Sequence, residues 1–259
     1  MPAQPINLNS DLGEGYGPWT MGDDAAMLAI VNSANVACGG HAGDPDVMRA
    51  TVRQARQHGV SIGAHPSYPD LRGFGRRAMN LTPEELKNQV AAQIGALSAV
   101  AALEGMRVTH VKPHGALNNQ ACVDRRLADT ICTSIHAIDP ALILLAPAAS
   151  ELVSAGRNAG LAVVEEIFAD RAYLPDGQLV PRSRPDAMIH GAAACLAHVR
   201  AMLDAGALIA IDGTRIPTPI GSICVHGDSP GAVAVAHALR EGLEAAGLRL
   251  ATLPELAKG

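Results

Sequence analysis

Short apolar runs alternate with amphipathic helical patterns along most of this sequence, and the alternation limits the folds that are open to it. The apolar runs lie at residues 6–8, 33–38, 60–64, 108–111, 143–146, 162–168 and, as the last strand, 222–225. Strands that alternate with helices indicate a parallel sheet, and roughly seven such units allow the sheet to close into a barrel. We therefore predict an α/β fold, a (β/α) barrel with all 259 residues in a single domain, 1–259.

The helical patterns carry their own start and stop signals. A helix over 46–58 is bounded by Asp44-Pro45 at its start and by Gly59 at its end. Residues 82–85, Thr-Pro-Glu-Glu, form a capping box that begins a long amphipathic helix. Residues 207–220 contain an Asp-Gly pair, which indicates a hairpin inserted at the rim of the barrel. Further helices are predicted at 127–138, 150–160 and 189–203, with a last one starting at Ser229-Pro230.

The composition excludes several classes of protein. Hydrophobic residues make up 48% of the chain and charged residues 17%, so a large buried core is expected and disorder is not. Only 2% of the residues are aromatic, so the core has to be built from Ala, Leu, Val and Ile. A formal net charge of −5, without a basic stripe, argues against binding to nucleic acid.

The sequence has the character of a cytoplasmic protein that does not enter membranes. Its five cysteines contain no Cys-x-x-Cys pair and resemble the buried thiols of a cytosolic protein. The first residues have neither the charged region nor the apolar region of a secretory signal. The longest apolar run, 141–149, is broken by Pro147 and falls short of the ~20 residues that a membrane span needs.

Polar residues follow nearly every apolar run. In parallel α/β folds the ligand lies at the carboxyl ends of the strands, so these side chains are expected to converge on one mouth of the barrel. A single His or Asp at a strand end is more often a structural residue, and the prediction therefore depends on the recurrence. The set comprises Asn7, Asn9, Asp11, Glu14, His41, His65, Lys112, His114, Glu166, Asp170, Arg171, His226 and Asp228.

The segment 108–117 is the most informative of these strand ends. Pro113 lacks a backbone donor and Gly115 tolerates unusual dihedral angles, so the strand has to stop and present Lys112 and His114 in an irregular segment. The chain has only three lysines, and burying a charged one is costly unless a partner or ligand compensates. Lys112 is therefore predicted to have a function.

Two kinds of catalysis suit these strand-end residues. In acid–base chemistry, Asp11 or Glu14 would activate water while Lys112 or His114 stabilises developing negative charge. In covalent catalysis, Lys112 would form a Schiff base, which requires that the pKa of its amine be lowered. The residues alone leave both open.

A metal and a nucleotide are the cofactors to consider. Asp11, His41 and His65 lie on three neighbouring strand ends and form a ligand set that fits zinc or another divalent ion, although their spacing is long. No Gly-x-x-x-x-Gly-Lys-Ser/Thr segment occurs, and the glycine-rich turns lack the context of a dinucleotide site. A nucleotide, if one is used, is therefore not expected to be held by this chain alone.

Six sequence blocks, taken together, resemble the LamB/YcsF lactam-utilisation family, whose characterised members are A subunits of the bacterial ATP-dependent 5-oxoprolinase. The similarity runs from the first predicted strand to the last. Two residues depart from the usual pattern: Ser10 stands in place of Cys, and Asn118 in place of Tyr, where it could alter one wall of the substrate pocket. The blocks are residues 7–14, 34–45, 63–77, 111–117, 166–173 and 223–228.

The resemblance implies a fold, a reaction and partners. The fold would be a barrel akin to those of glycoside hydrolases and deacetylases. The activity would open 5-oxo-L-proline to L-glutamate while ATP is hydrolysed to ADP and phosphate. ATP would bind with or on partner subunits, PxpB and PxpC, which agrees with the missing nucleotide motif.

The resemblance also implies roles for the strand-end residues. Lys112 and His114 would stabilise the phosphorylated or tetrahedral species, and Asp11 or Glu14 would direct water. Arg171 or Arg72 would hold the substrate carboxylate, although a salt bridge from Arg171 to Asp170 or Glu166 is the structural alternative. Arg76 and Arg77 are expected to serve loop structure or a subunit contact. The expected substrate-binding residues are Asn7, Asn9, His65, Arg72, Glu166, Arg171, His226 and Asp228.

Two other functions stay open at this point. A metal-dependent amidohydrolase or deacetylase that acts without ATP would use Asp11, His41 and His65 as ligands. A non-catalytic subunit would bind the lactam while its partners carry out the chemistry.

Overall fold

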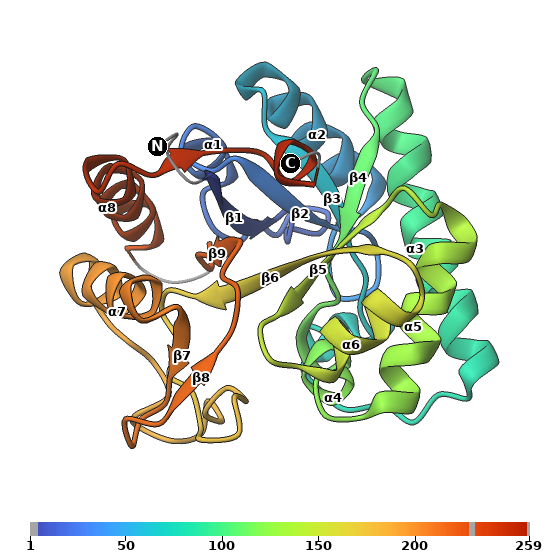
Figure 1. Cartoon of the computed structure of the whole chain (residues 1–259). Helices are drawn as coiled ribbons and strands as arrows, with labels where there is room; N and C mark the ends of the chain where they lie inside the picture. The colour runs from blue at the N-terminus through green and yellow to red at the C-terminus, as the bar shows by residue number, and fades with distance from the viewer. Residues whose placement is uncertain (1–4, 228–230, 258–259) are drawn as a thin grey trace.

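The computed structural model describes residues 5–227 and 231–257. Within these residues, seven parallel strands close into a barrel in the order β1-β2-β3-β4-β5-β6-β9, with β9 pairing back to β1 (Figure 1). The predicted (β/α) barrel is thereby confirmed. The strands are β1 (Pro5–Leu12), β2 (Ser33–Ala37), β3 (Ser61–His65), β4 (Val108–Val111), β5 (Ile143–Pro147), β6 (Ala162–Phe168) and β9 (Ser222–Cys224).

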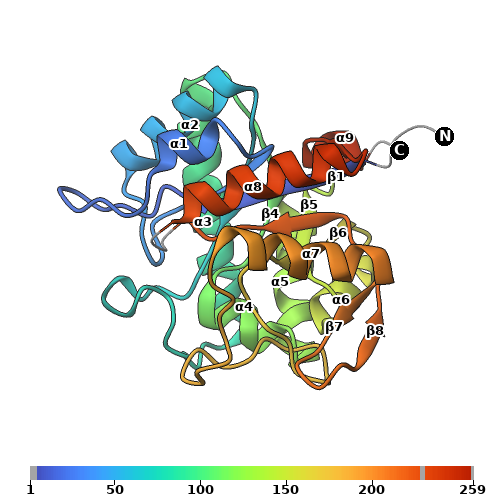
Figure 2. The same ribbon diagram turned by 90° about the vertical axis from the view of Figure 1, so that its left-hand side faces the viewer.

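Helices cover the outside of the barrel. Figure 1 shows α2, α3 and α5 on one side and α7 and α8 on the other, and Figure 2 shows α7 and α8 side by side. The longer helices are α2 (Pro45–His58), α3 (Pro83–Leu103), α5 (Arg125–Ile138), α7 (Ala192–Ala205) and α8 (Ala232–Ala245). The shorter ones are α1 (Asp24–Leu28), a 3-10 turn (Leu71–Gly73), α4 (Gly115–Ala121), α6 (Glu151–Asn158) and α9 (Leu253–Leu256).

The capping signals act where the sequence places them. The Asp44 side chain accepts hydrogen bonds from backbone N–H groups in the first turn of α2, and Gly59 ends that helix in the left-handed conformation. At the start of α3, Thr82 and Glu85 make both hydrogen bonds of a capping box. These side chains satisfy backbone donors that a helix leaves without partners, and so they fix where each helix begins.

The hairpin after α7 is also present, while the C-terminal part differs from the prediction. Strands β7 (Ala207–Ile209) and β8 (Arg215–Pro217) pair antiparallel outside the barrel. The strand predicted at 222–225 is present as β9, but it is not the last strand, because β10 (Arg249–Leu250) follows it and pairs in parallel with the start of β1. A strand of two residues is too short to give a recognisable apolar period. The helix start predicted at Ser229-Pro230 lies outside the described residues.

The apolar core lies between the barrel wall and the helices and consists mainly of Ala, Leu, Val and Ile side chains. A second, smaller cluster forms where Leu253 of α9 packs against Ile143 and Leu145 of β5. The segment after β10 therefore closes one end of the barrel and leaves the carboxyl ends of the strands at the other. Among residues 5–227 and 231–257, no helix has the length and apolar character that crossing a membrane requires.

Candidate functional site

Lys112 is placed by the abrupt end of β4. Pro113 cannot continue the strand ladder, and α4 begins two residues later at Gly115, whose φ is +58°. A Cβ at Gly115 would lie 2.5 Å from the Gly75 carbonyl oxygen, so only glycine lets the loop after β3 approach this closely. The same oxygen accepts a hydrogen bond from the Ala116 N–H at 2.9 Å. The strand end is thus fastened to the neighbouring loop.

The ammonium group of Lys112 is buried among two carboxylates and a thiol. Its Nζ lies 3.1 Å from Asp11 Oδ1, 3.1 Å from Glu166 Oε2 and 3.1 Å from Cys224 Sγ. Burial alone would lower the pKa of Lys112, but the charges of Asp11 and Glu166 outweigh it and hold this pKa well above its usual value. Schiff-base chemistry needs the opposite shift, so the geometry favours a permanently charged lysine.

The two carboxylates beside Lys112 differ in their ionisation. Burial would raise the pKa of Asp11, but the neighbouring His65 and Lys112 hold that pKa well below the usual value. Burial raises the pKa of Glu166, although Lys112 opposes the shift. Glu166 is fully buried, and its Oε1 has no hydrogen-bond partner among the described residues. Asp11 is therefore the permanent counter-ion of Lys112.

A column of polar side chains fills the barrel beneath Lys112. The Asn35 amide donates hydrogen bonds of 2.8 Å to both Asn9 Oδ1 and Asp11 Oδ1. Further down, the Asn7 amide donates to the Ala251 carbonyl oxygen at 2.8 Å, next to the closed end of the barrel. Residues at i, i+2 and i+4 of a strand share one face, which is why Asn7, Asn9 and Asp11 all point inward. Of these three, only Asp11 lines the cavity described next.

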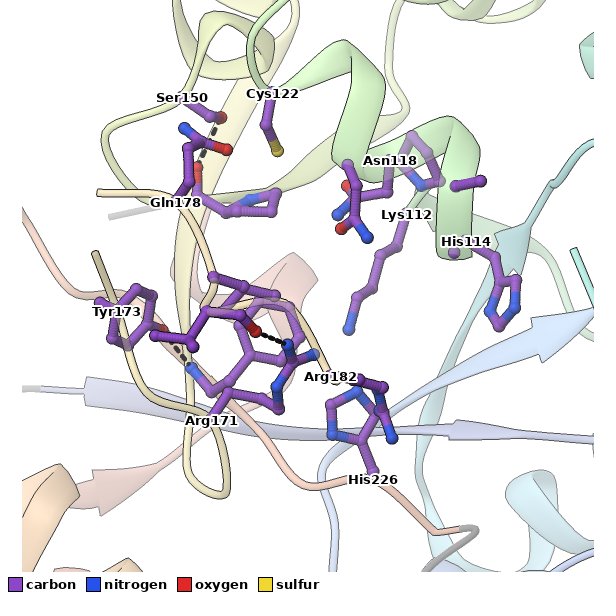
Figure 3. A pocket seen from close by; sticks show the side chains of 18 of the residues that line it. Lys112, His114, Asn118, Cys122, Ser150, Arg171, Tyr173, Gln178, Arg182 and His226 are labelled. Carbon is purple, nitrogen blue, oxygen red and sulfur yellow. Dashed lines mark hydrogen bonds between the residues drawn. The ribbon is translucent and has the colours of Figure 1, made fainter. Parts of the chain in front are cut away.

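A cavity of about 680 Å³ opens above this column, at the carboxyl ends of the strands. Figure 3 shows the Lys112 side chain extending into it, with Asn118 and His114 on one side and Arg171 and His226 on the other. The structure brings seven of the predicted site residues to its wall: Asp11, Glu14, His65, Lys112, His114, Arg171 and His226. The predicted residues Asn7, Asn9, Arg72 and Glu166 do not line it.

Four side chains from neighbouring strand ends form a compact group beside the cavity. One ligand atom from each of Glu14, His41, His65 and His114 lies within 4.8 Å of those of the others, and all four residues are buried. Glu14 Oε1 is 3.0 Å from His41 Nε2 and 3.5 Å from His114 Nδ1. His65 Nε2 is 3.0 Å from His114 Nδ1. This group contains His41 and His65 of the predicted metal set, whereas Asp11 belongs to the Lys112 cluster, with its Oδ2 3.3 Å from His65 Nε2.

The remaining predicted residues have separate surroundings. His226 Nδ1 is 2.8 Å from Asp170 Oδ1, and Asp170 does not line the cavity. Arg171 donates from Nη2 to the Val180 carbonyl oxygen at 2.7 Å, while its buried Nε has no partner among the described residues. No ion pair joins Arg171 to Asp170 or Glu166 within residues 5–227 and 231–257.

The arginines of the loop after β3 divide between the cavity and the surface. Arg72 lies away from the cavity wall, in the exposed 3-10 turn. Arg77 pairs with Asp70, which matches its expected role in loop structure. Arg76 lines the cavity, and its guanidinium lies 4.9 Å from the centre of the Phe74 ring. Asp228, also predicted as a site residue, lies outside the described residues.

Some residues of the site were not predicted from the sequence. Cys224 belongs to an apolar run, yet its thiol contacts Lys112. Asn35 and His110, which are hydrogen-bonded to each other at 3.1 Å, also lie in runs that are otherwise apolar. A polar residue inside a β-run is the signal that could have found them. Asn118, noted only as a departure from the family pattern, does line the cavity.

The fold and the site together define a (β/α)-barrel protein with a buried charged site at the carboxyl ends of its strands. A family model described as the LamB/YcsF family matches residues 6–258. The chain belongs to this family.

Individual proteins support this assignment. A relative from Azoarcus sp. (strain BH72), named as the A subunit of 5-oxoprolinase, is 57% identical over 251 residues, which cover 97% of this chain and 98% of the relative. The crystal structure of the lactam utilization protein from Thermus thermophilus matches with a TM-score of 0.90 and 44% identity, covering 96% of this chain and 100% of that one. A structure of T48 deacetylase with substrate matches with a TM-score of 0.50 and 15% identity, covering 99% and 92% of the two chains. This last likeness concerns the fold alone.

Proposed function

We propose that this chain is the A subunit of an ATP-dependent 5-oxoprolinase, which converts 5-oxo-L-proline to L-glutamate while ATP is hydrolysed to ADP and phosphate. The relative with 57% identity over nearly its whole length carries the name of that subunit. The observation that carries the proposal is the charged Lys112, held by Asp11 and Glu166 at the wall of a cavity at the carboxyl ends of the strands.

The chemistry explains why ATP is needed. An unstrained lactam resists water, because its amide resonance makes the carbonyl carbon a poor electrophile and its nitrogen a poor leaving group. Transfer of the terminal phosphoryl group of ATP to the amide oxygen removes this resonance. Water then adds to the carbon, the ring C–N bond breaks with protonation of nitrogen, and a second water releases phosphate from the resulting acyl phosphate. The net reaction consumes lactam, ATP and two waters and gives glutamate, ADP and phosphate.

Lys112 contributes to these steps through its charge. Its three N–H groups already face Asp11, Glu166 and Cys224, so it stabilises negative charge on a nearby oxygen by its field. Asp11 and Glu14 are the carboxylates of this group that border the cavity, so one of the two directs the attacking water. Glu166 forms an ion pair with Lys112 but does not line the cavity, so it does not contact the substrate.

Arginines of the cavity wall recognise the anionic parts of the substrate. Burial lowers the pKa of Arg171 to about 10, so it stays charged at neutral pH, and its place at the cavity wall suits it to bind the carboxylate of 5-oxoproline. Arg76 and Arg182 line the same cavity and add positive charge where a phosphoryl group would enter. Of the two arginines predicted to hold the substrate carboxylate, Arg171 borders the cavity and Arg72 does not.

The proposal includes partners, PxpB and PxpC, that bind ATP or complete its site. The relatives are named as one lettered subunit of an enzyme, which supports an assembly of several subunits. The test is glutamate release from 5-oxoproline and ATP, first with this chain alone and then with both partners. Activity in the mixture alone is expected. If neither preparation releases glutamate, the proposal fails, and metal-dependent hydrolysis of another amide without ATP becomes the reaction to assay next.

A further inference from the structure

The hydrogen bonds of two histidines beside the cavity fix their tautomers. His65 Nδ1 lies 2.7 Å from the Lys112 carbonyl oxygen, and His114 Nε2 lies 3.0 Å from the Phe74 carbonyl oxygen. A carbonyl oxygen only accepts hydrogen bonds, so each of these nitrogens must carry the proton of its ring. In the neutral rings, His65 Nε2 and His114 Nδ1 are then both lone-pair nitrogens.

These two lone pairs face each other across 3.0 Å, which is unfavourable unless a positive charge lies near both. A proton or a metal ion would remove the conflict. The carboxylate of Glu14, 3.5 Å from His114 Nδ1, adds a third donor atom that a metal ion would use.

The spacing of the donor atoms also suits a metal. Four ligands at about 2.0–2.1 Å in tetrahedral geometry lie about 3.3 Å from one another. The two separations that involve His114 Nδ1 are 3.0 Å to His65 Nε2 and 3.5 Å to Glu14 Oε1. Glu14, His65 and His114 all line the cavity, so the remaining coordination position would face it.

His41 has a different role from these three residues. Its ring is stacked on that of His114, with centroids 3.6 Å apart and planes inclined by 1°. An ion in the plane of the His114 ring therefore lies outside the plane of the His41 ring, where a lone pair cannot reach it. His41 does not line the cavity, and its Nε2 is 3.0 Å from Glu14 Oε1. It is placed to hold the Glu14 carboxylate in position, as hydrogen-bonded neighbours of metal ligands do.

We propose that Glu14, His65 and His114 bind one divalent transition-metal ion, with His41 as a positioning residue. The His₂Glu set and its open position fit Zn²⁺ best. The set shares only His65 with the predicted Asp11, His41 and His65. A second group, Asp11, Cys224 and His226, is a poorer candidate because the Lys112 ammonium already contacts Asp11 and Cys224. The inference does not depend on the lactam reaction, because binding is measured without substrate.

The test is a titration of the chelator-stripped full chain with Zn²⁺ and with Co²⁺, followed by calorimetry and by metal analysis after gel filtration. One ion per chain is expected. Glu14→Gln and His114→Ala should remove tight binding, and His41→Ala should weaken it by about 10- to 100-fold. The matched control is His58→Ala, since His58 is exposed at the end of α2. Far-UV circular dichroism checks that each variant is folded.

Two results would overturn the proposal. The first is wild-type protein that takes up neither ion saturably, which would mean that a second proton on His65 or His114 resolves the facing lone pairs. The second is loss of the ion in Cys224→Ser together with retention in Glu14→Gln and His114→Ala, which would assign binding to the other group. Glu14→Gln is nearly isosteric, so it keeps the test valid even if His114→Ala does not fold.

Discussion

At the scale of single residues, the position of Lys112 combines a large cost with a specific compensation. An ammonium group this deep in a protein is stable only if opposite charges accompany it, and Asp11 and Glu166 do so at 3.1 Å each. Removing one partner of such a group leaves the others buried without an opposite charge beside them. The arrangement therefore makes Lys112 difficult to replace, whatever its part in catalysis.

Replacing Lys112 by methionine tests whether it acts on the transition state. Lys112→Met keeps most of the side-chain volume and removes the charge, so we expect turnover by the assembled subunits to fall by about 10²–10³-fold with a smaller change in KM. Lys87→Met, on the exposed side of α3, is the control. A parallel loss of lactam binding and turnover would instead support a non-catalytic, lactam-binding role.

Stability has to be followed in the same experiment. Breaking a buried ion pair by removing one partner typically costs about 3–5 kcal/mol. Assays of Lys112→Met should therefore be run well below its measured Tm.

Asn118 is expected to contribute to substrate recognition. Its side-chain carbonyl oxygen is buried without a hydrogen-bond partner among the described residues, and the residue lines the cavity. The side-chain amide of Asn118 is therefore suited to form a hydrogen bond with the lactam amide. Asn118→Ala should raise KM by about 10-fold, the value of one hydrogen bond of about 1.4 kcal/mol. Asn88→Ala on α3 serves as the control, and an unchanged KM in Asn118→Ala would exclude this contact.

At the scale of helices and strands, the sequence predicts best what is long and capped. The helix bounds of α2 and α3 follow from Asp44, Gly59 and the Thr82 capping box, because these signals act locally. By contrast, α1, α4 and β10 are too short for a periodic pattern and are held by tertiary contacts. The pairing of β10 with β1 joins residues that are about the whole chain apart, so no local signal announces it.

The same limit applies to the site. Alternation along β1 correctly turns Asn7, Asn9 and Asp11 toward the inside of the barrel. It does not give their position along the barrel axis, which depends on the stagger between neighbouring strands. Only Asp11 reaches the cavity, and the other two belong to the polar column below it.

Glu104, at the end of α3, pairs with Arg49 and Arg53 of α2, and we call this set the carboxylate clamp. It predicts how the stability of the protein depends on pH. Hydrogen bonds from Arg53 and then Arg49 lower the pKa of Glu104 from 4.5 to about 2. Because this pKa is depressed in the folded state, its stabilising effect is present above about pH 4.5 and is lost as the pH falls toward 2. Glu104→Gln should therefore flatten the acid limb of the unfolding curve in that interval.

The measurement is the urea midpoint of unfolding as a function of pH, for the wild type and for Glu104→Gln. Glu241→Gln, on the exposed side of α8, is the matched control and should follow the wild type. If wild type and Glu104→Gln lose stability in parallel from pH 4.5 to 2, the ionised Glu104 does not contribute to the stability of the folded protein.

At the scale of the whole molecule, the barrel has one open and one closed end. The cavity lies at the carboxyl ends of the strands, and the segment after β10 covers the opposite end, where Asn7 donates to the Ala251 carbonyl oxygen. Pairing of β10 with β1 ties the last described strand to the first. We propose on this basis that residues 1–259 form a single domain whose closure depends on its C-terminal segment.

This closure makes Leu253 a test of stability that is separate from function. Leu253 is fully buried against Ile143 and Leu145, so Leu253→Ala should lower the free energy of unfolding by about 2–5 kcal/mol. Leu103→Ala removes the same atoms from a side chain that is 66% exposed, and a change within about 0.5 kcal/mol is expected there. Urea unfolding measures both values.

The same Leu253→Ala variant should keep its lactam affinity wherever it is folded, because the site lies at the other end of the barrel. A variant that loses affinity while still folded would show that the two ends are coupled through the polar column. The hydrogen bonds from Asn7 to Ala251 and from Asn35 to Asp11 are the contacts that such coupling would use. Comparing affinity with stability in one variant therefore decides whether the closed end only supports the barrel or also sets the geometry around Lys112.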